Sequence, residues 1–248
     1  MDPLLTPADS AAPPSSTAPV AEVASAPAPA EPTSWANPGA HARFWVFAAF
    51  GLALDLWSKQ AAFHWLRQGN EPVVLIPYVL SFTTMFNPGA LFGIGAGRTT
   101  VFLGASALAL VLVLWMFLNS SPRRAMLQIA LGGILAGALG NMYDRLYVQL
   151  VRLDIHEQRR FYEREDQADR IVLREYPPIE GGATLSLPLG APIDAPIGHV
   201  RDFIKINSTF FGREIWPWVF NVADMLLVGG VSILIWNMWR ETRPRART

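Results

Sequence analysis

The sequence predicts a membrane protein of the all-α class: a four-transmembrane-helix bundle with a small extracytoplasmic β segment and an inserted extracytoplasmic loop. The composition is the first reason, because 51% hydrophobic and 16% charged residues with a mean hydropathy of +0.25 are unlike a soluble enzyme. The second reason is that residues 99–118 form an apolar stretch without a single charge. About 20 such residues cross the hydrocarbon core of a bilayer.

Three further stretches approach the same length, although one of them is interrupted by charges. Pro217 suits the first position of the last helix, and Asp55 and Lys59 interrupt the first. We therefore predict membrane spans at residues 44–66, 99–118, 125–143 and 217–239.

The basic residues predict the orientation of these spans. Arg123 and Arg124 fill the short loop between the second and third spans, and four more arginines crowd the C-terminal tail. Short loops rich in arginine stay in the cytoplasm, whereas long loops cross with little regard to charge. We expect both termini on the cytoplasmic side and residues 70–98 and 145–214 outside.

The segments outside the spans differ in composition. Residues 1–40 are rich in Pro and Ala, which predicts a disordered arm ahead of a four-span domain at residues 41–248. The β-branched and aromatic residues of 70–98 predict a small sheet. An insertion at residues 147–199 holds a charged part, 153–170, which is compatible with a helix, and a part rich in Pro and Gly.

Several classes of chemistry are excluded by composition. The chain has no Cys, and none of its four His lies in an HExxH motif, so disulfides, thiol catalysis and zinc sites are not expected. Neither a GxSxG motif nor a phosphate-binding loop is present. The zero net charge gives no reason to expect a nucleic-acid partner. Carboxylates remain as the main candidates for catalysis.

Two acids near one end of the predicted bundle are candidates for a catalytic pair. Asp224 shares a helical face with Asn221 inside the last predicted span, and strand alternation over 200–206 places Asp202 among aliphatic residues. The alternatives are a structural hydrogen bond for Asp224 and a solvated Asp202 paired with Arg201. Two neighbouring carboxylates cannot both ionise, so one acts as base and the other as acid, which suits hydrolysis of an amide.

The third and first spans carry further polar residues. Gly133 and Gly137 form a GxxxG pattern that lets another backbone approach closely. Asn141, Asp144 and Arg145 follow on one face, where an interfacial salt bridge is as reasonable as catalysis. Asp55 and Lys59 have i,i+4 spacing, for which an intrahelical ion pair is the simple explanation.

Taken together, these residues resemble the bacterial lipoprotein signal peptidases (signal peptidase II), a family of four-span aspartic proteases. The resemblance covers most of residues 44–239 and rests on five blocks in the family's order. These blocks are DLWSK at 55–59, NPGALFG at 87–93, GALGNMYDR at 137–145, VRDFIKI at 200–206 and FNVAD at 220–224.

The resemblance implies roles for individual residues. The family's catalytic aspartates fall on Asp202 and Asp224. Asp144 is implied to orient the site, and a permanent arginine neighbour makes it unsuited to sharing a proton. The supporting and substrate-binding positions implied by the family are Asp55, Lys59, Asn87, Gly137, Asn141, Asp144, Arg145 and Asn221.

The resemblance also implies the activity. A member of this family removes the signal peptide from a diacylglyceryl-modified prolipoprotein, cutting on the N-terminal side of the lipidated cysteine without a metal or other cofactor. The implied partners are lipidated prolipoproteins and membrane lipids. We expect a monomer in the bacterial cytoplasmic (inner) membrane with its active site near the extracytoplasmic face.

One residue and one insertion depart from the family pattern. Leu91 stands where the family usually has a smaller Ala. Asp144 and Asp202 are 58 positions apart, because about 50 residues are inserted where the family has a short loop. We expect this insertion to be a passive excursion, with a lid or a docking surface as the alternatives.

Two other functions remain to be distinguished from proteolysis. A small ion-coupled transporter predicts charges staged through the depth of the membrane, together with an inverted repeat, which the sequence lacks. A non-catalytic membrane assembly factor would not need both Asp202 and Asp224. A presenilin-like protease would require a GxGD motif, which is absent.

Overall fold

A computed structural model describes most of the chain outside its two ends. The described residues are 33–66, 71–89, 99–155, 158–177, 182–211 and 213–242. The predicted disorder of residues 1–32, the position of Leu91 and the C-terminal arginines beyond residue 242 lie outside this set.

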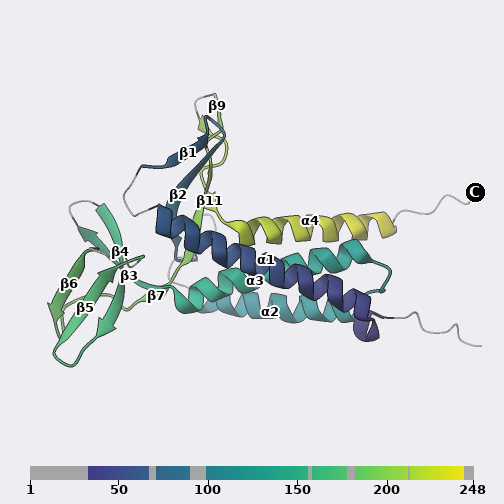
Figure 1. Cartoon of the computed structure of the whole chain (residues 1–248), viewed down its shortest axis with the longest axis horizontal. Coiled ribbons are helices and arrows are strands. Elements are labelled where there is room, and N and C mark those ends of the chain that lie inside the picture. The colour runs from purple at the N-terminus through teal and green to yellow at the C-terminus, as the bar shows by residue number, and fades with distance from the viewer. Residues whose placement is uncertain are drawn as a thin grey trace, which may run out of the picture. The chain divides into compact units, whose positions relative to one another are not determined.

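Four long helices carry most of the apolar sequence: α1 (Pro38–Trp65), α2 (Thr99–Asn119), α3 (Ala125–Tyr147) and α4 (Val222–Thr242). α3 lies between the others and packs against all three, as Figure 1 shows for α1 and α4. By length and composition alone, Ala125–Tyr147 and Val222–Arg240 are able to cross a membrane. Leu103–Asn119 is apolar but shorter.

The boundaries of the first and last helices differ from the predicted spans. Asn37 caps α1 by accepting a hydrogen bond from the amide of Ala40 at 2.8 Å, so the helix starts at Pro38 rather than residue 44. A short 3-10 helix, η1 (Ser34–Ala36), precedes it, and the buried Ser34 hydroxyl lies 2.9 Å from that of Ser120. Residue 40 is therefore the wrong boundary for a disordered arm.

The prediction that Pro217 begins the last helix is also wrong. Val219 and Phe220 form a short strand that pairs with Lys205 and Ile204, and this pairing keeps the chain extended up to Asn221. α4 begins only at Val222. Asp224 therefore lies in the first turn of the helix and not about 10 Å along it.

A four-stranded antiparallel sheet adjoins the ends of the helices. Its strands, in spatial order, are β1 (Val73–Ile76), β2 (Leu80–Asn87), β8 (Val200–Ile206) and β11 (Val219–Phe220). The predicted sheet within residues 70–98 is confirmed for the part that the structure describes. In this register Met85 lies opposite Asp202 and Asn87 opposite Val200, so three distant segments of the chain meet beside α4.

The insertion folds as a second antiparallel sheet. Its five strands, in spatial order, are β6 (Thr184–Pro188), β5 (Arg170–Glu175), β4 (Gln158–Asp166), β3 (Gln149–Ile155) and β7 (Ile197–Gly198). A further hairpin joins β9 (Thr209–Phe210) to β10 (Arg213–Glu214). The all-α classification is thus too narrow, and the helix considered for 153–170 is wrong.

Contacts across the strands explain why this charged segment forms a sheet. Tyr162, Ile171 and Leu173 are buried on one face of the insertion sheet, which charged residues such as Arg164 and Glu175 share. Some of these charges pair across strands, as in the ion pair of Arg160 with Glu175 at 2.6 Å. Cross-strand contacts among the buried residues and ion pairs between strands therefore organise this charged segment.

Small residues on α3 allow the close helix packing that the GxxxG pattern predicted. A methyl group on Gly137 would meet the backbone carbonyl oxygen of Ala223 and, at 2.7 Å, the side chain of Leu227. A methyl group on Gly132 would meet the carbonyl oxygen of Phe44 at 2.6 Å. α3 therefore touches the backbones of α1 and α4 at positions where only glycine fits.

We predict that Gly137→Ala destabilises the protein by about 1–3 kcal/mol, because the added methyl group pushes α4 away from α3. The midpoint of thermal unfolding in detergent measures this loss. Gly104→Ala is the matched control, since nothing lies within 4 Å of its added methyl group. Equal unfolding midpoints for the two variants would contradict the close packing of α3 on α4.

Candidate active site

Asp202 lies in the middle of β8 with both carboxylate oxygens bound by side-chain amides. Oδ1 accepts a hydrogen bond from Asn221 Nδ2 at 2.6 Å, and Oδ2 accepts one from Asn87 Nδ2 at 3.2 Å. The residue is only 2% exposed. Alternation along β8 turns Arg201 to the opposite side, so the alternative of a solvated Asp202 paired with Arg201 is wrong.

Asp224 is held by the start of α4. Asn221 Oδ1 accepts from the Asp224 amide at 3.0 Å, and Asp224 Oδ2 accepts from the Asn221 amide at 3.1 Å. This reciprocal pair is a capping box, with Asn as the cap and Asp three residues later. Amide donors at a helix N-terminus favour a carboxylate, and Asp224, unlike Asp202, is only partly buried.

The amides of Asn141 and Asn221 connect the two carboxyl groups. Asn141 Nδ2 donates to Asp224 Oδ1 at 2.8 Å, while Asn221 Nδ2 donates to Asp202 Oδ1. Asn221 Nδ2 also lies 3.2 Å from Asn141 Oδ1. Each amide has its nitrogen toward an acid, so both carboxyl groups are fixed by donors from neighbouring elements.

Lys59 fixes the orientation of the Asn141 amide. Its Nζ donates to Asn141 Oδ1 at 3.1 Å and forms ion pairs with Asp55 at 2.8 Å and Asp144 at 3.3 Å. The side chains of all three charged residues are fully buried. The intrahelical ion pair of Asp55 with Lys59 is thus present, but within a larger buried network.

Asp55 links this network to α4. Its Oδ1 accepts a hydrogen bond from the backbone amide of Ala223 at 2.8 Å, which satisfies one of the free donors in the first turn of α4. A side chain on Gly140 would collide with Asp55 Oδ2. The small residue at 140 therefore makes room for the carboxylate.

Asp144 is held by an arginine to which the sequence interpretation gave no functional role. Its Oδ1 accepts from Arg201 Nε at 3.1 Å and Nη2 at 2.7 Å, and its Oδ2 accepts from the Arg201 amide at 2.9 Å. Arg201 Nη1 also donates to Gln60 Oε1 at 3.1 Å and to the hydroxyl of Tyr176 at 3.3 Å. Tyr176 belongs to the insertion.

The two remaining sequence candidates lie at the edge of this network. Arg145 Nη1 donates to the backbone carbonyl of Asn141 at 3.3 Å, and its charge lies within electrostatic range of Asp202 and Asp224. Gly137 lies one turn before Asn141, against Ala223. The structure therefore brings all ten predicted site residues to one place and adds Arg201, Gln60 and Tyr176.

Burial governs the protonation of Asp202. Burial and, next, the nearby Asp224 raise the pKa of Asp202 to about 8, while hydrogen bonds from Asn87 and Asn221 and the charge of Lys59 oppose the shift. Asp202 consequently keeps its proton at neutral pH. A neutral acid beside a second carboxyl group is the arrangement that shared-proton catalysis requires.

The carboxylates in the described part of the chain are not arranged as metal ligands, since no three acidic or histidine side chains converge there. Their oxygens instead face lysine, arginine and amide donors. Donors of this kind compete with a cation for the same lone pairs. The arrangement suits acid–base chemistry on a water molecule.

We predict that the stability of Asp202→Asn relative to wild type rises by about 3–5 kcal/mol between pH 4.5 and pH 8. Because the pKa is raised on folding, wild type loses stability as the pH rises from the unfolded value, about 4, to the folded value of about 8. The asparagine variant does not titrate. Its advantage in thermal unfolding midpoint should therefore be larger at pH 8 than at pH 4.5, whereas the exposed Asp166→Asn should show no such trend.

Comparison with known proteins gives a consistent family assignment. The family profile described as "Signal peptidase (SPase) II" matches residues 47–240. A lipoprotein signal peptidase from Moorella thermoacetica is 30% identical over 79% of this chain and 91% of its own length. One from Chlorobaculum tepidum is 32% identical over 83% of this chain and 99% of its own length.

A shorter match and a solved structure agree with this assignment. A lipoprotein signal peptidase from Rhodopirellula baltica is 41% identical over 109 residues, which are 43% of this chain and 49% of that relative. A structure described as a bacterial membrane enzyme has a TM-score of 0.55 at 22% identity and covers 82% of this chain and 92% of its own. This likeness shows the fold of a membrane enzyme with apolar helices and sheets. With the profile and the two long matches, it establishes that the chain belongs to the signal peptidase II family.

Proposed function

We propose that this protein is an aspartic endopeptidase that removes the signal peptide from diacylglyceryl-modified prolipoproteins, cutting N-terminal to the lipidated cysteine. The observation that supports this most is the pair Asp202 and Asp224, bridged by the amides of Asn141 and Asn221. The relatives are named lipoprotein signal peptidases, which supplies the substrate class.

In the proposed reaction, Asp224 acts as base and Asp202 as acid. The Asp224 carboxylate takes a proton from water, whose oxygen attacks the scissile carbonyl carbon, while protonated Asp202 donates its proton to the carbonyl oxygen. The resulting tetrahedral diol collapses when Asp224 returns a proton to the departing amine. Asp202 recovers its own proton from the diol, so the C–N bond breaks and the dyad is restored.

The supporting residues fix the direction and charge of the two carboxyl groups. Asn87, Asn141 and Asn221 donate to them, and Lys59 orients Asn141. Asp55 anchors the first turn of α4 through the Ala223 amide. In this proposal Asp144 serves through its ion pairs, Arg145 places positive charge beside the dyad, and Gly137 allows α4 to approach.

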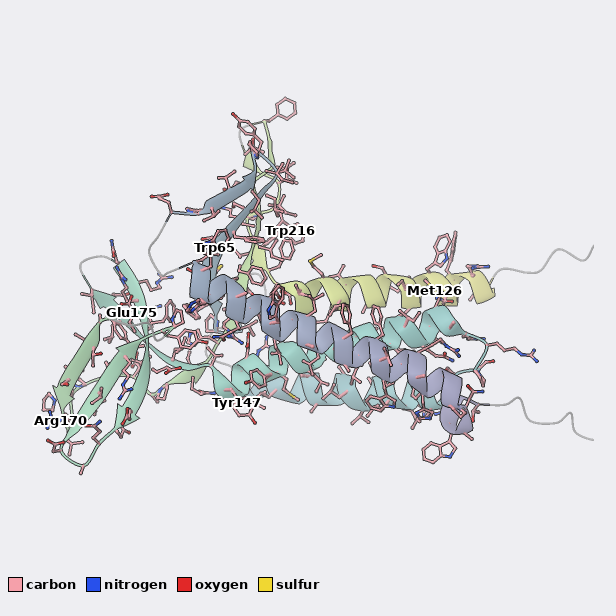
Figure 2. All side chains as sticks on the ribbon, viewed as in Figure 1. Trp65, Met126, Tyr147, Arg170, Glu175 and Trp216 are labelled. Atoms are coloured by element: carbon pink, nitrogen blue, oxygen red, sulfur yellow. The ribbon has the colours of Figure 1, made fainter. Side chains whose placement is uncertain are left out.

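We propose that α1, α2, α3 and α4 all span the bacterial cytoplasmic membrane, with both termini in the cytoplasm. Large apolar side chains face outward along the helices, and lipid would cover them. They include Trp45, Val46, Phe50, Val101, Leu108, Val111, Leu112, Trp115, Val228, Val231 and Ile235. Exposed Trp65 and Tyr147 end α1 and α3, opposite the Met126 end of α3 (Figure 2), at the depth of an interfacial aromatic belt.

In this proposed orientation, the dyad would lie near the extracytoplasmic face. The charges lie toward the sheet-proximal ends of the helices, because Asp55 is in the second half of α1 and Asp224 in the first turn of α4. An ion-coupled transporter would require charges staged through the bundle. Exposed Val74, Leu75 and Ile76 on β1 form an apolar edge that suits contact with the lipid chains of the substrate. We propose that the enzyme acts as a monomer.

We predict that Asp202→Asn and Asp224→Asn each lower the turnover of a diacylglyceryl-modified prolipoprotein by at least about 10³-fold. Each substitution removes the acid or the base without changing the size of the side chain. Cleavage by the detergent-purified protein, followed on a gel, measures the loss. Asp166→Asn, on the exposed end of β4, is the control and should cut at the wild-type rate.

Two outcomes would contradict this assignment. Turnover by Asp202→Asn within tenfold of wild type would remove Asp202 from the reaction. Failure of the wild-type protein to cut the lipidated substrate, while remaining folded, would reject proteolysis altogether. The wild-type protein should not cut the unlipidated prolipoprotein, and this assay tests the requirement for the lipid.

We predict that kcat/KM falls as the pH rises above about 8, because Asp202 of the free enzyme then loses the proton that it donates to the substrate. A stopped assay of initial rates between pH 5 and pH 10 measures this limb. Protein incubated at pH 10 and returned to pH 7 should recover full activity, which separates titration from unfolding. A rate that stays level to pH 10 would show that protonated Asp202 is not required.

A further inference from the structure

Arg201 is buried at the point where the insertion, β8, α1 and α3 meet. It is 4% exposed, and its guanidinium group binds three side chains from separate elements. Nε and Nη2 bind Asp144 of α3, whereas Nη1 binds both Gln60 of α1 and Tyr176 of the insertion. A planar fork held on all sides has little freedom to change direction.

Tyr176 is itself fixed by packing. It follows directly after β5 and is 8% exposed, and its ring lies 5.6 Å from that of Phe86, the residue before Asn87. Its backbone amide donates to the carbonyl of Phe161 at 3.0 Å. The hydroxyl therefore approaches Arg201 from a buried and closely packed residue of the insertion.

A continuous series of contacts leads from Arg201 to the dyad. Arg201 holds Asp144, Asp144 pairs with Lys59 at 3.3 Å, and Lys59 donates to Asn141 Oδ1 at 3.1 Å. Asn141 Nδ2 then donates to Asp224 at 2.8 Å. Without Arg201, Asp144 would draw Lys59 away from Asn141, because a buried carboxylate requires a compensating charge.

We propose that Arg201 is a positioning residue for the catalytic dyad and that Tyr176 holds it in place, so that the insertion forms part of the active-site scaffold. This inference rests on the proposed function. It replaces the expectation of a passive excursion, because a passive loop would leave no side chain in contact with the buried ion pairs.

The first test compares Tyr176→Phe with Tyr162→Phe. The former removes the hydroxyl that accepts from Arg201, while Tyr162 is a buried tyrosine of the same sheet that packs with Ile171 and Leu173. We expect Tyr176→Phe to lower kcat by about threefold to tenfold and to change KM by less than about twofold. The reason is that the hydroxyl affects Asp224 through Arg201 and the buried ion pairs and does not contact the substrate. Tyr162→Phe should leave both constants unchanged.

The second test is a double-mutant cycle with Arg201→Gln. We expect Arg201→Gln to lower kcat by at least about 30-fold, because Asp144 Oδ1 loses the positive charge and both guanidinium donors. In that background Tyr176→Phe should have no further effect, because its contact is already lost. Arg201→Lys, which keeps the charge but not the fork, should lie between wild type and Arg201→Gln.

The results distinguish this inference from the proposed function. Equal kcat values for Tyr176→Phe and Tyr162→Phe would overturn the positioning role of Arg201. Additive losses in the double-mutant cycle would do the same. In either case, cleavage by the wild-type protein would still support the proposed protease activity. A wild-type protein that cuts nothing would reject both. If Arg201→Gln fails to fold, the comparison of the two tyrosine variants still decides.

Discussion

The balance of charge between Lys59, Arg201, Asp55 and Asp144 is the constraint on which the rest of the site depends. Two cations and two anions are buried within a few ångströms, so each charge has a partner of opposite sign. Removing any one would leave an uncompensated charge where water cannot reach it. This balance allows polar groups to sit between apolar helices, and it leaves the amide of Asn141 free to serve Asp224 rather than to neutralise a neighbour.

The first turn of α4 is the second organising element. Its free backbone donors are taken by carboxylates from two directions, since Asp55 binds the Ala223 amide and Asp224 binds the Asn221 amide. Asn221 also reaches back to Asp202, so a single residue caps the helix and orients the buried acid of β8. The position of the proposed catalytic pair is therefore tied to where the helix begins. The pairing of β11 with β8 determines that point.

Local sequence patterns predicted much of this arrangement and failed where competing patterns overlapped. Hydropathy located the helices, and strand alternation separated Asp202 from Arg201. The start of α4 was misplaced because Pro217 and the apolar residues after it suit a helix, whereas the capping box in FNVAD marks the start correctly. The helix considered for 153–170 was wrong because the charged residues of β4 share a face with Tyr162, so this strand shows no alternation that marks it as a strand. The contacts of Arg201 with Asp144 and Tyr176 span 57 and 25 positions, and no local pattern reports pairs so distant.

The insertion leaves and rejoins the chain through neighbouring strands, because Gln149 lies opposite Gly198 and Leu150 opposite Ile197. The two ends are already together where α3 stops and β8 starts, so the length of chain between them is not constrained by the helices. Lengthening a loop whose ends are fixed adds little entropic cost. This junction is therefore a place where evolution can exchange one excursion for another while keeping the membrane-embedded part intact. If the active site depends on Arg201, an insertion at this junction would have to keep a hydrogen-bond acceptor for Arg201, as the Tyr176 hydroxyl does here.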